Sequence, residues 1–286
     1  MAQHTPGDQT PRKPQNAGTH NDVRQIEERN VAVVERERRG NVEILTINRP
    51  EARNAINGEV STAMAAALDE LETDKQCWAV IVTGAGDRAF SAGMDLKAFA
   101  SGELGAIASA PGGFAGITQR NFSKPLIAAL NGHALAGGCE IMLACDMVVA
   151  ADHVTIGIPE VKRGLIAGAG GLIRLPRRLP MAIAFELGLT GEPIDAKRAY
   201  DLGLVNRVVP GADLIDEAMV LAKSVTANAP LAVRWSKRIM KESIYLTEKE
   251  GWKLVGEAAP EVFSSPDAME GAIAFAEKRP PNWETP

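Results

Sequence analysis

Two glutamates lie in apolar stretches of the sequence and are the strongest candidates for acid–base chemistry. Glu140 follows two glycines in AGGCEIMLACD, and Glu160 follows Pro159 at the end of the run VTIGI. A carboxylate among apolar residues is costly unless it is paired, exposed or functional. Each glutamate also has an ordinary explanation, as a charge at a helix N-terminus or as a loop residue. Brought together, two such carboxyls would suit proton transfer to and from a substrate.

The glycines before Glu140 suggest a site for negative charge. Gly137 and Gly138 open a predicted helix, and a second glycine-containing turn, SAGMD, ends an earlier strand. Free N–H groups at a helix N-terminus attract an anion, and glycine lets a ligand approach the backbone closely. Two such groups converging would form an oxyanion hole for an enolate or thioester oxygen. For each segment the alternative remains that its glycines only permit tight turns.

Other reaction classes find less support. The four histidines, His4, His20, His133 and His153, have no carboxylate or cysteine at metal-ligand spacing. There is no G-x-S-x-G elbow, no phosphate loop and no dinucleotide fingerprint. The sequence therefore predicts neither a metal site nor a hydrolase of the elbow type.

Composition indicates a soluble globular protein. The chain has 286 residues, 45% hydrophobic and 23% charged, with a net charge of −5. An acidic chain is a poor general ligand for nucleic acid or an anionic membrane. No apolar run approaches the roughly 18 residues of a membrane span, and the N-terminus has no secretory h-region. We expect reduced, buried thiols and a cytoplasmic protein from the three cysteines, Cys77, Cys139 and Cys145.

The order of strands and helices predicts an α/β fold with a helical C-terminal part. Alternating or continuous apolar runs indicate a hairpin, several short buried strands and two helices before residue 160, whereas the chain beyond residue 177 is mainly helical. Residues 97–120 are rich in Gly and Ala and are predicted to be a loop with some helix. We expect a disordered tail over 1–28, a core over 29–209 and a helical region over 210–286.

Five segments in order resemble the enoyl-CoA hydratase/isomerase (crotonase) family. The similarity runs from about residue 31 to the end of the chain. One segment alone would be a weak match, but five with family-like spacing are specific. The segments are NRPEARNA (48–55), FSAGMDLK (90–97), NGHALAGGCEIMLACD (131–146), FELGLTGEPIDAKRAYDLGLVNRVV (185–209) and AFAEKRPPNW (274–283).

The resemblance implies a fold and a ligand. The family builds a spiral of ββα turns with two sheets, followed by a helical region that assembles trimers, often paired into hexamers. The implied ligand is an acyl-CoA thioester, and coenzyme A is then part of the substrate, with no metal or redox cofactor. No nucleic acid or membrane partner is expected.

The resemblance also assigns roles to residues. It places the oxyanion donors on the N–H groups of Ala92 and Gly137, and a water-holding amide on Gly168. The acid–base pair of the hydratases matches Glu140 and Glu160; many other members of the family keep one glutamate or neither. Coenzyme A binding is expected along the turn after the first oxyanion segment and at a C-terminal lysine, which has the alternative of being a solvated charge. These residues are Gly93, Met94, Asp95, Leu96, Lys97 and Lys278.

Hydration of a trans-2-enoyl-CoA across its 2,3 double bond is therefore the predicted reaction. The chain departs from the usual pattern at Ala167, where proline is common, and at Leu172 and Ile173, where Thr-Gln is common. RLPRRLP (174–180) instead resembles a branch that includes carnitinyl-CoA dehydratases. The alternatives are dehydration of that type, an enoyl-CoA isomerase with one glutamate, and a non-enzymatic binding protein.

Overall fold

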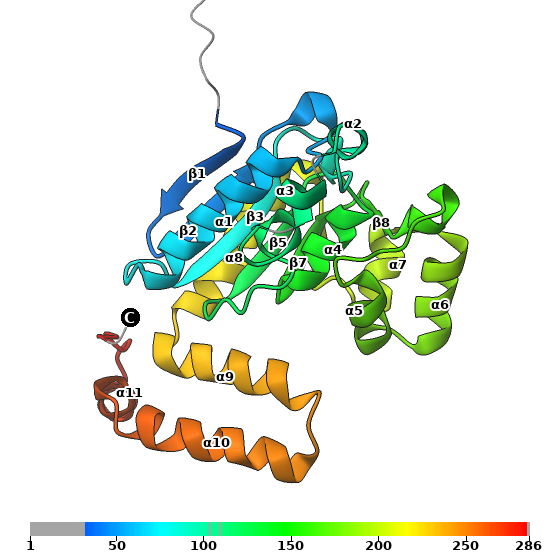
Figure 1. Cartoon of the computed structure of the whole chain (residues 1–286). Helices are drawn as coiled ribbons and strands as arrows, with labels where there is room; N and C mark the ends of the chain where they lie inside the picture. Colours follow the sequence, from blue (N-terminus) through cyan, green and yellow to red (C-terminus); the bar gives the residue numbers. More distant parts are fainter. Residues whose placement is uncertain (1–31, 103, 109, 285–286) are drawn as a thin grey trace, which may run out of the picture. The chain divides into compact units, whose positions relative to one another are not determined.

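A computed structural model describes residues 32–102, 104–108 and 110–284 (Figure 1). The tail predicted over 1–28 lies outside the described residues. The first described element is the predicted hairpin, in which β1 (Val34–Arg39) pairs antiparallel with β2 (Val42–Ile47). Its turn contains Gly40 at a φ of 62°, a left-handed conformation that glycine adopts without strain.

A six-stranded sheet forms the larger layer, in the order β1-β2-β3-β5-β7-β10. From β2 onward, neighbouring strands pair in parallel. The two central strands are buried throughout, which explains their continuous apolar sequences. The remaining strands of this sheet are β3 (Ala79–Gly84), β5 (Leu126–Leu130), β7 (Met147–Ala151) and β10 (Arg207–Val209).

A second sheet of four short strands has the order β4-β6-β8-β9. The first three run parallel, and β9 is antiparallel to β8. The chain passes from the larger sheet to the smaller one three times, from β3 to β4, from β5 to β6 and from β7 to β8. The strands of this sheet are β4 (Ala89–Ser91), β6 (His133–Leu135), β8 (Thr155–Gly157) and β9 (Ile194–Asp195).

Helices follow these strand pairs and then continue to the C-terminus. The predicted helix after residue 57 is α1, and its Asn57 cap accepts the N–H of Val60 at 3.0 Å. The α-helices are α1 (Gly58–Thr73), α2 (Leu96–Ala100), α3 (Leu104–Ala108), α4 (Gly137–Ala144), α5 (Gly171–Arg178), α6 (Met181–Thr190), α7 (Ala196–Asp201), α8 (Leu214–Thr226), α9 (Pro230–Ser243), α10 (Glu248–Phe263) and α11 (Pro266–Glu277). The short 3-10 helices are η1 (Pro50–Ala52), η2 (Phe114–Gly116), η3 (Pro159–Arg163) and η4 (Gly211–Asp213).

The larger sheet is covered on both faces (Figure 1). Val80 and Val82 of β3 belong to the same buried cluster as the apolar face of α1. Ile81, between them, points to the other face and packs in a cluster with Ala218 and Ala222 of α8. The core therefore includes α8, although the sequence places that helix within the C-terminal region that begins at residue 210.

The last three helices carry large apolar side chains on their surface. Trp252 and Phe263 of α10 are 63% and 79% exposed, and Phe275 of α11 is 87% exposed. Such side chains are typical of a surface that another protein covers. Among the described residues, no helix is both long and apolar enough to cross a membrane.

Candidate active site

Three parallel strands bring the predicted site together. β4, β6 and β8 are neighbours in the smaller sheet and run in the same direction, so their carboxyl ends meet at one edge. The turn 92–95 follows β4, the N-terminus of α4 follows β6, and Glu160 of η3 follows β8. Segments that are far apart in the sequence thereby become neighbours in space.

Glycines allow the first two segments to approach closely. A Cβ atom on Gly93, whose φ is +89°, would stand 2.6 Å from the nitrogen of Gly137. A Cβ atom on Gly138 would stand 2.0 Å from the carbonyl oxygen of Ser91. Just before α4, Ala136 has a φ of 51°, which is uncommon for a residue with a side chain. The contact between the two segments therefore depends on the absence of side chains at both glycines.

The structure contradicts the role predicted for Ala92. Its N–H donates to the carbonyl oxygen of Arg53 at 3.0 Å, so it is not available to a substrate oxygen. The next N–H, that of Gly93, donates to Oγ of Ser91 at 3.1 Å. Both bonds hold the turn in place, so a donor for the substrate must come from further along it.

The N–H of Met94 has no acceptor among the described residues, unlike the N–H groups of Ala92 and Gly93 before it. The parallel bridge of Met94 to Ile56 uses the carbonyl of Gly93 and the N–H of Asp95, so the N–H of Met94 points away from Ile56. Gly137, on the neighbouring segment, is the first residue of α4, and its N–H has no acceptor within the helix. The backbone approach therefore brings together two segments, each with an N–H donor that has no acceptor among the described residues.

Glu140 is deeply buried on the first turn of α4, with 3% of its surface exposed. Its Oε1 accepts the N–H of Gly171 at 2.8 Å, and the N–H of Ala169 bonds to the same carboxylate. The pKa of Glu140 is raised to about 7, mainly by burial and also by the nearby charge of Glu160, although the N–H donors of Gly171 and Ala169 act to lower it. This carboxyl therefore titrates near neutral pH.

Glu160 is half-buried in η3, which begins at Pro159. Its Oε2 is shielded from solvent and has no hydrogen-bond partner among the described residues. Burial raises the pKa of this carboxyl as well. An unpartnered buried oxygen is costly when it is charged, so the site favours either a protonated Glu160 or a ligand that contacts it.

The two carboxyls titrate as a pair because the charge of Glu160 acts on Glu140. Deeper burial favours the proton on Glu140, whereas its two N–H donors favour the ionised form there. Glu160 has an oxygen without such a donor. Since both pKa values are raised, the pair can hold one proton near neutral pH and thus offers an acid and a base together.

Gly168 lies exposed in the loop between η3 and α5, at the position where the sequence predicts a water-holding amide. That role stays a prediction. The amides that bond Glu140 are those of Ala169 and Gly171, which sequence reasoning missed. The run of glycines just before a helix was the available signal, because helix N-termini present unbonded N–H groups.

Arg174 of α5 is a second residue that the sequence alone did not single out. Its Nη1 donates to the carbonyl of Ala169 at 3.2 Å, and its Nη2 donates to the carbonyl of Thr118. Its charge also lowers the pKa of Glu140. Arg174 therefore connects the loop that holds Glu140 to the segment after η2.

Phe114 stands beside the start of α4. Its ring carbons Cε1 and Cζ would lie 2.6 Å from a Cβ atom on Gly137, and the residue is buried. Phe99, the other aromatic residue of the 97–120 segment, is 37% exposed. One aromatic ring of the 97–120 segment is thus placed next to the two backbone donors.

The predicted coenzyme A segment is held by the carboxylate of Asp95. This side chain caps α2 by accepting the N–H of Lys97 at 3.0 Å, and it pairs with Arg49 at 3.1 Å. Leu96 and Lys97 are exposed. Lys278 is exposed at the end of α11, which lies apart from α2 and α4 (Figure 1).

The three cysteines are buried and unpaired, as predicted. Burial raises the pKa of the Cys139 thiol, next to Glu140 in the chain, so it stays protonated. Within the described ranges, no group of three or more His, Cys, Asp or Glu side chains is arranged to hold a metal ion.

Relatives of known name share most of the chain. The family model described as enoyl-CoA hydratase/isomerase matches residues 37–286. Carnitinyl-CoA dehydratase of Escherichia coli (strain K12) is 42% identical over 252 residues, which cover 86% of this chain and 96% of the relative. The protein of the same name from Proteus mirabilis (strain HI4320) is 42% identical over 251 residues, with the same coverage.

Solved structures are similar over the same region. Enoyl-CoA hydratase from Mycobacterium tuberculosis H37Rv is 50% identical with a TM-score of 0.85, covering 88% of this chain and 99% of that one. Carnitinyl-CoA hydratase from Mycobacterium avium is 48% identical with a TM-score of 0.71, covering 88% and 98%. The resemblance seen in the sequence is thus confirmed, and the chain belongs to the enoyl-CoA hydratase/isomerase (crotonase) family of enzymes.

Proposed function

We propose that this enzyme adds water to, or removes water from, the bond between the α- and β-carbons of an acyl-CoA thioester. The observation that carries the proposal is the pairing of the buried carboxyl of Glu140 with the half-buried carboxyl of Glu160, beside two backbone segments whose N–H donors have no acceptor among the described residues. Addition of water requires a base for the water and an acid for the α-carbon, and the pair can supply both. Family members that move a double bond need only one such group.

In the proposed mechanism, the N–H groups of Met94 and Gly137 hold the thioester oxygen. As water adds to the β-carbon, the electrons of the double bond move toward that oxygen, and its negative charge grows. Donors placed to meet such charge stabilise the transition state; loss of one in other enzymes costs about 2.7–4 kcal/mol. Met94 takes this role in place of Ala92, because the N–H of Ala92 is already bonded to Arg53.

Glu140 takes the proton from water, and Glu160 gives a proton to the α-carbon. The assignment rests on hydrogen bonds: two N–H groups stabilise the ionised form of Glu140, whereas Glu160 has a buried oxygen without a donor. Loss of water is the reverse: Glu160 takes a proton from the α-carbon, and Glu140 gives its proton to the leaving hydroxyl. The amide of Gly168 would hold the water between them.

The preferred substrate has two candidates. The simpler one is a trans-2-enoyl-CoA with an uncharged acyl group, in keeping with the apolar Phe114 beside Gly137. Dehydration of carnitinyl-CoA is the second, and the relatives at 42% identity bear that name. The ring of Phe114 also suits it, because an aromatic face attracts a quaternary ammonium group.

A turnover assay with purified protein tests both candidates. Short, medium and bulky trans-2-enoyl-CoA thioesters are compared with carnitinyl-CoA, and the products are identified by mass. A product heavier by one water from the enoyl substrates, or lighter by one water from carnitinyl-CoA, supports the proposal and selects the substrate. Conversion to an isomer of unchanged mass, or no conversion of any of them, would contradict it.

Assembly is part of the same proposal. We expect a trimer, alone or paired into a hexamer, in which the exposed apolar residues of α10 and α11 are covered. Because α11 lies apart from α2 and α4 within one chain, Lys278 would reach the coenzyme A phosphates of a neighbouring copy. Removal of this lysine should then raise KM and leave kcat unchanged.

A further inference from the structure

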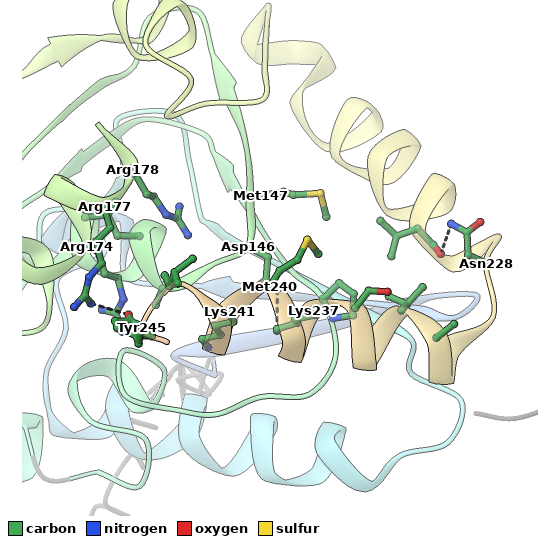
Figure 2. A pocket seen from close by; sticks show the side chains of 18 of the residues that line it. Asp146, Met147, Arg174, Arg177, Arg178, Asn228, Lys237, Met240, Lys241 and Tyr245 are labelled. Atoms are coloured by element: carbon green, nitrogen blue, oxygen red, sulfur yellow. Dashed lines mark hydrogen bonds and ion pairs between the residues drawn. The ribbon is translucent and has the colours of Figure 1, made fainter. Parts of the chain in front are cut away.

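A cavity of about 710 Å³ lies away from the two glutamates. It is bounded by α5, α8 and α9 and by the carboxyl end of α4 (Figure 2). The candidate active site lies at the opposite, N-terminal end of α4. Leu143 and Ala144 of α4 line the cavity, but Gly137 and Glu140 do not. The proposed reaction makes no use of this space.

Five cationic side chains line this cavity, from α5 and α9: Arg174, Arg177, Arg178, Lys237 and Lys241. The one carboxylate in the lining, that of Asp146, pairs with Lys237 at 2.8 Å. In the part of the chain that the structure describes, the other four cations have no carboxylate within ion-pair distance. Positive charge therefore exceeds negative charge here, although the whole chain has a net charge of −5.

Part of this charge is used to hold the fold. Arg178 donates to the carbonyl of Cys145 at 2.6 Å, at the end of α4. Arg177 donates to the hydroxyl of Tyr245 at 2.7 Å and stacks 4.1 Å from the centre of its ring. Since each guanidinium carries five N–H donors, these bonds leave donors for a ligand. Burial, and next the charge of Lys237, lower the pKa of half-buried Lys241. The cations of this cluster therefore repel one another.

A neighbouring cavity has a smaller excess of positive charge. This space of about 320 Å³ is lined by four cations, Arg234, Lys237, Arg238 and Lys241, and by two carboxylates, those of Glu72 and Glu261. The larger cavity has five cations and one carboxylate, so its excess of positive charge is greater.

The rest of the larger cavity is apolar and extends along α9. Figure 2 shows Arg174, Arg177 and Arg178 at one end with Tyr245, and Asn228 at the other. The apolar side chains come from α4, β7, α8 and α9. They are Leu143, Met147, Val225, Val233, Met240 and Ile244.

We propose that this cavity binds a single-chain anionic amphiphile. Its phosphate or carboxylate head would lie between the arginines of α5, which bind such groups with paired hydrogen bonds, and its alkyl chain would lie along α9. An anion neutralises the unpaired cations, and the apolar wall buries the chain. Arg174 also donates to the carbonyl of Ala169, and the N–H of Ala169 bonds the carboxylate of Glu140. A ligand bound to Arg174 would therefore contact a residue that helps to position Glu140.

Calorimetric titration of the full chain provides the test. Dodecyl phosphate and dodecanoate serve as probes below their micelle concentrations, with dodecyl maltoside and dodecyltrimethylammonium as uncharged and cationic controls. We expect saturable binding of one anionic probe per chain and no comparable binding of the controls. Tighter binding of dodecyl phosphate would identify a phosphate head, and tighter binding of dodecanoate a carboxylate head.

Three variants locate the binding. Arg177→Glu changes an exposed cation of the cluster and should weaken binding about tenfold or more. Lys249→Glu changes the net charge equally on α10, outside the cavity, and should leave the affinity unchanged. Ala232→Phe would occupy the apolar end and weaken binding by a similar factor.

If the Arg177→Glu variant and the parent bound the anionic probe with equal affinity, the proposal would be wrong. The probe would then bind outside this cavity, for example near Glu140 and Glu160. Equal binding of dodecyl maltoside would overturn the proposal too. Absence of binding together with a changed oligomeric state in Arg177→Glu would identify the cavity as a contact between copies instead. None of these outcomes depends on the reaction proposed above, since no turnover is measured.

Discussion

Glu140 and Glu160 illustrate how burial turns ordinary carboxyls into acid–base groups. A glutamate in water is ionised at pH 7, and burial opposes that charge. Glu140 receives two backbone N–H bonds, and its pKa still rises to about 7. The oxygen of Glu160 that lacks a partner is the place where a proton or a substrate would relieve that cost.

Loss of one proton donor should stop turnover without unfolding the protein. In Glu160→Gln the amide keeps the size of the side chain but cannot deliver a proton to the α-carbon. We expect turnover with the best thioester to fall by about 10²-fold or more, while the unfolding transition changes little. Steady-state kinetics and circular dichroism measure the two effects.

The matched control is Glu59→Gln, which removes a carboxylate from the exposed first turn of α1. Its turnover should equal that of the parent. Undiminished turnover in Glu160→Gln would rule out the two-glutamate mechanism.

Stability should depend on pH through Glu140. Its pKa in the folded state is about 7, above the usual 4.5, so the folded protein binds this proton more tightly than the unfolded chain does. The resulting stabilisation is fully present below about pH 4.5 and is lost as the pH rises through 7. At about 1.4 kcal/mol per pKa unit, the ionised group costs roughly 3 kcal/mol at pH 8.

Glu140→Gln should therefore unfold at higher urea concentration than the parent at pH 8, and at a similar concentration at pH 5. Gln still offers an oxygen to the N–H of Gly171, so the fold is kept. Urea titrations at the two pH values measure the difference. Parallel stability profiles for parent and variant would show that Glu140 does not titrate near neutrality.

At the scale of the elements, the smaller sheet positions the site. β4, β6 and β8 each contribute a short strand, and the next residues of each supply one part of the site. The sequence predicts the ends of β4 and β8 as short strands and α4 as a helix opened by glycines, but it does not predict β6, which has only three residues. The resemblance to the crotonase family predicts that Glu140 and Glu160 act together. The parallel pairing of β6 with β8 then places both glutamates after neighbouring strand ends.

The N-terminus of α5 should be sensitive to a single methyl group. A Cβ atom at Gly171 would stand 3.2 Å from Cγ and Oε1 of Glu140, and 3.0 Å from Cβ of Ala167. Gly171→Ala should therefore displace the carboxylate and lower kcat by about tenfold, while the free energy of unfolding changes by about 1 kcal/mol or less. Kinetics and urea unfolding measure the two.

Gly256→Ala is its control, because a Cβ atom there meets nothing within 4 Å. In the interior of α10, alanine should raise the free energy of unfolding by about 0.5–1 kcal/mol and leave kcat unchanged. If the two variants had equal activity, a methyl group at position 171 would not displace the carboxylate of Glu140.

At the scale of the whole molecule, the C-terminal helices leave apolar surface uncovered. Phe275 of α11 is 87% exposed, and Phe263 and Trp252 of α10 are also exposed; several large apolar side chains on one part of a surface are typical of an interface. We expect Phe275→Ser to shift the protein toward smaller species in sedimentation velocity. Lys253→Ser, an exposed polar site on α10, should leave the distribution unchanged. A parent protein that sediments as a monomer would contradict the predicted assembly.

The sequence by itself determined the family, the two glutamates, the glycines that bring two backbone segments together, and most of the strands and helices. These features follow from residue type and from spacing along the chain, because they depend on interactions between residues that are close in the sequence. The tertiary structure decided which N–H groups remain unused. Because Arg53 already accepts the N–H of Ala92, we propose Met94 for the oxyanion role instead.

Tertiary structure also decided the partners of Glu140, the place of α8 on the larger sheet and the cationic cavity beside α9. Each depends on contacts between residues distant in the sequence, such as Arg174 with Thr118 or Lys237 with Asp146. Backbone donors look the same at every position of a sequence. Only the folded chain shows which of them, and which charges, are already satisfied.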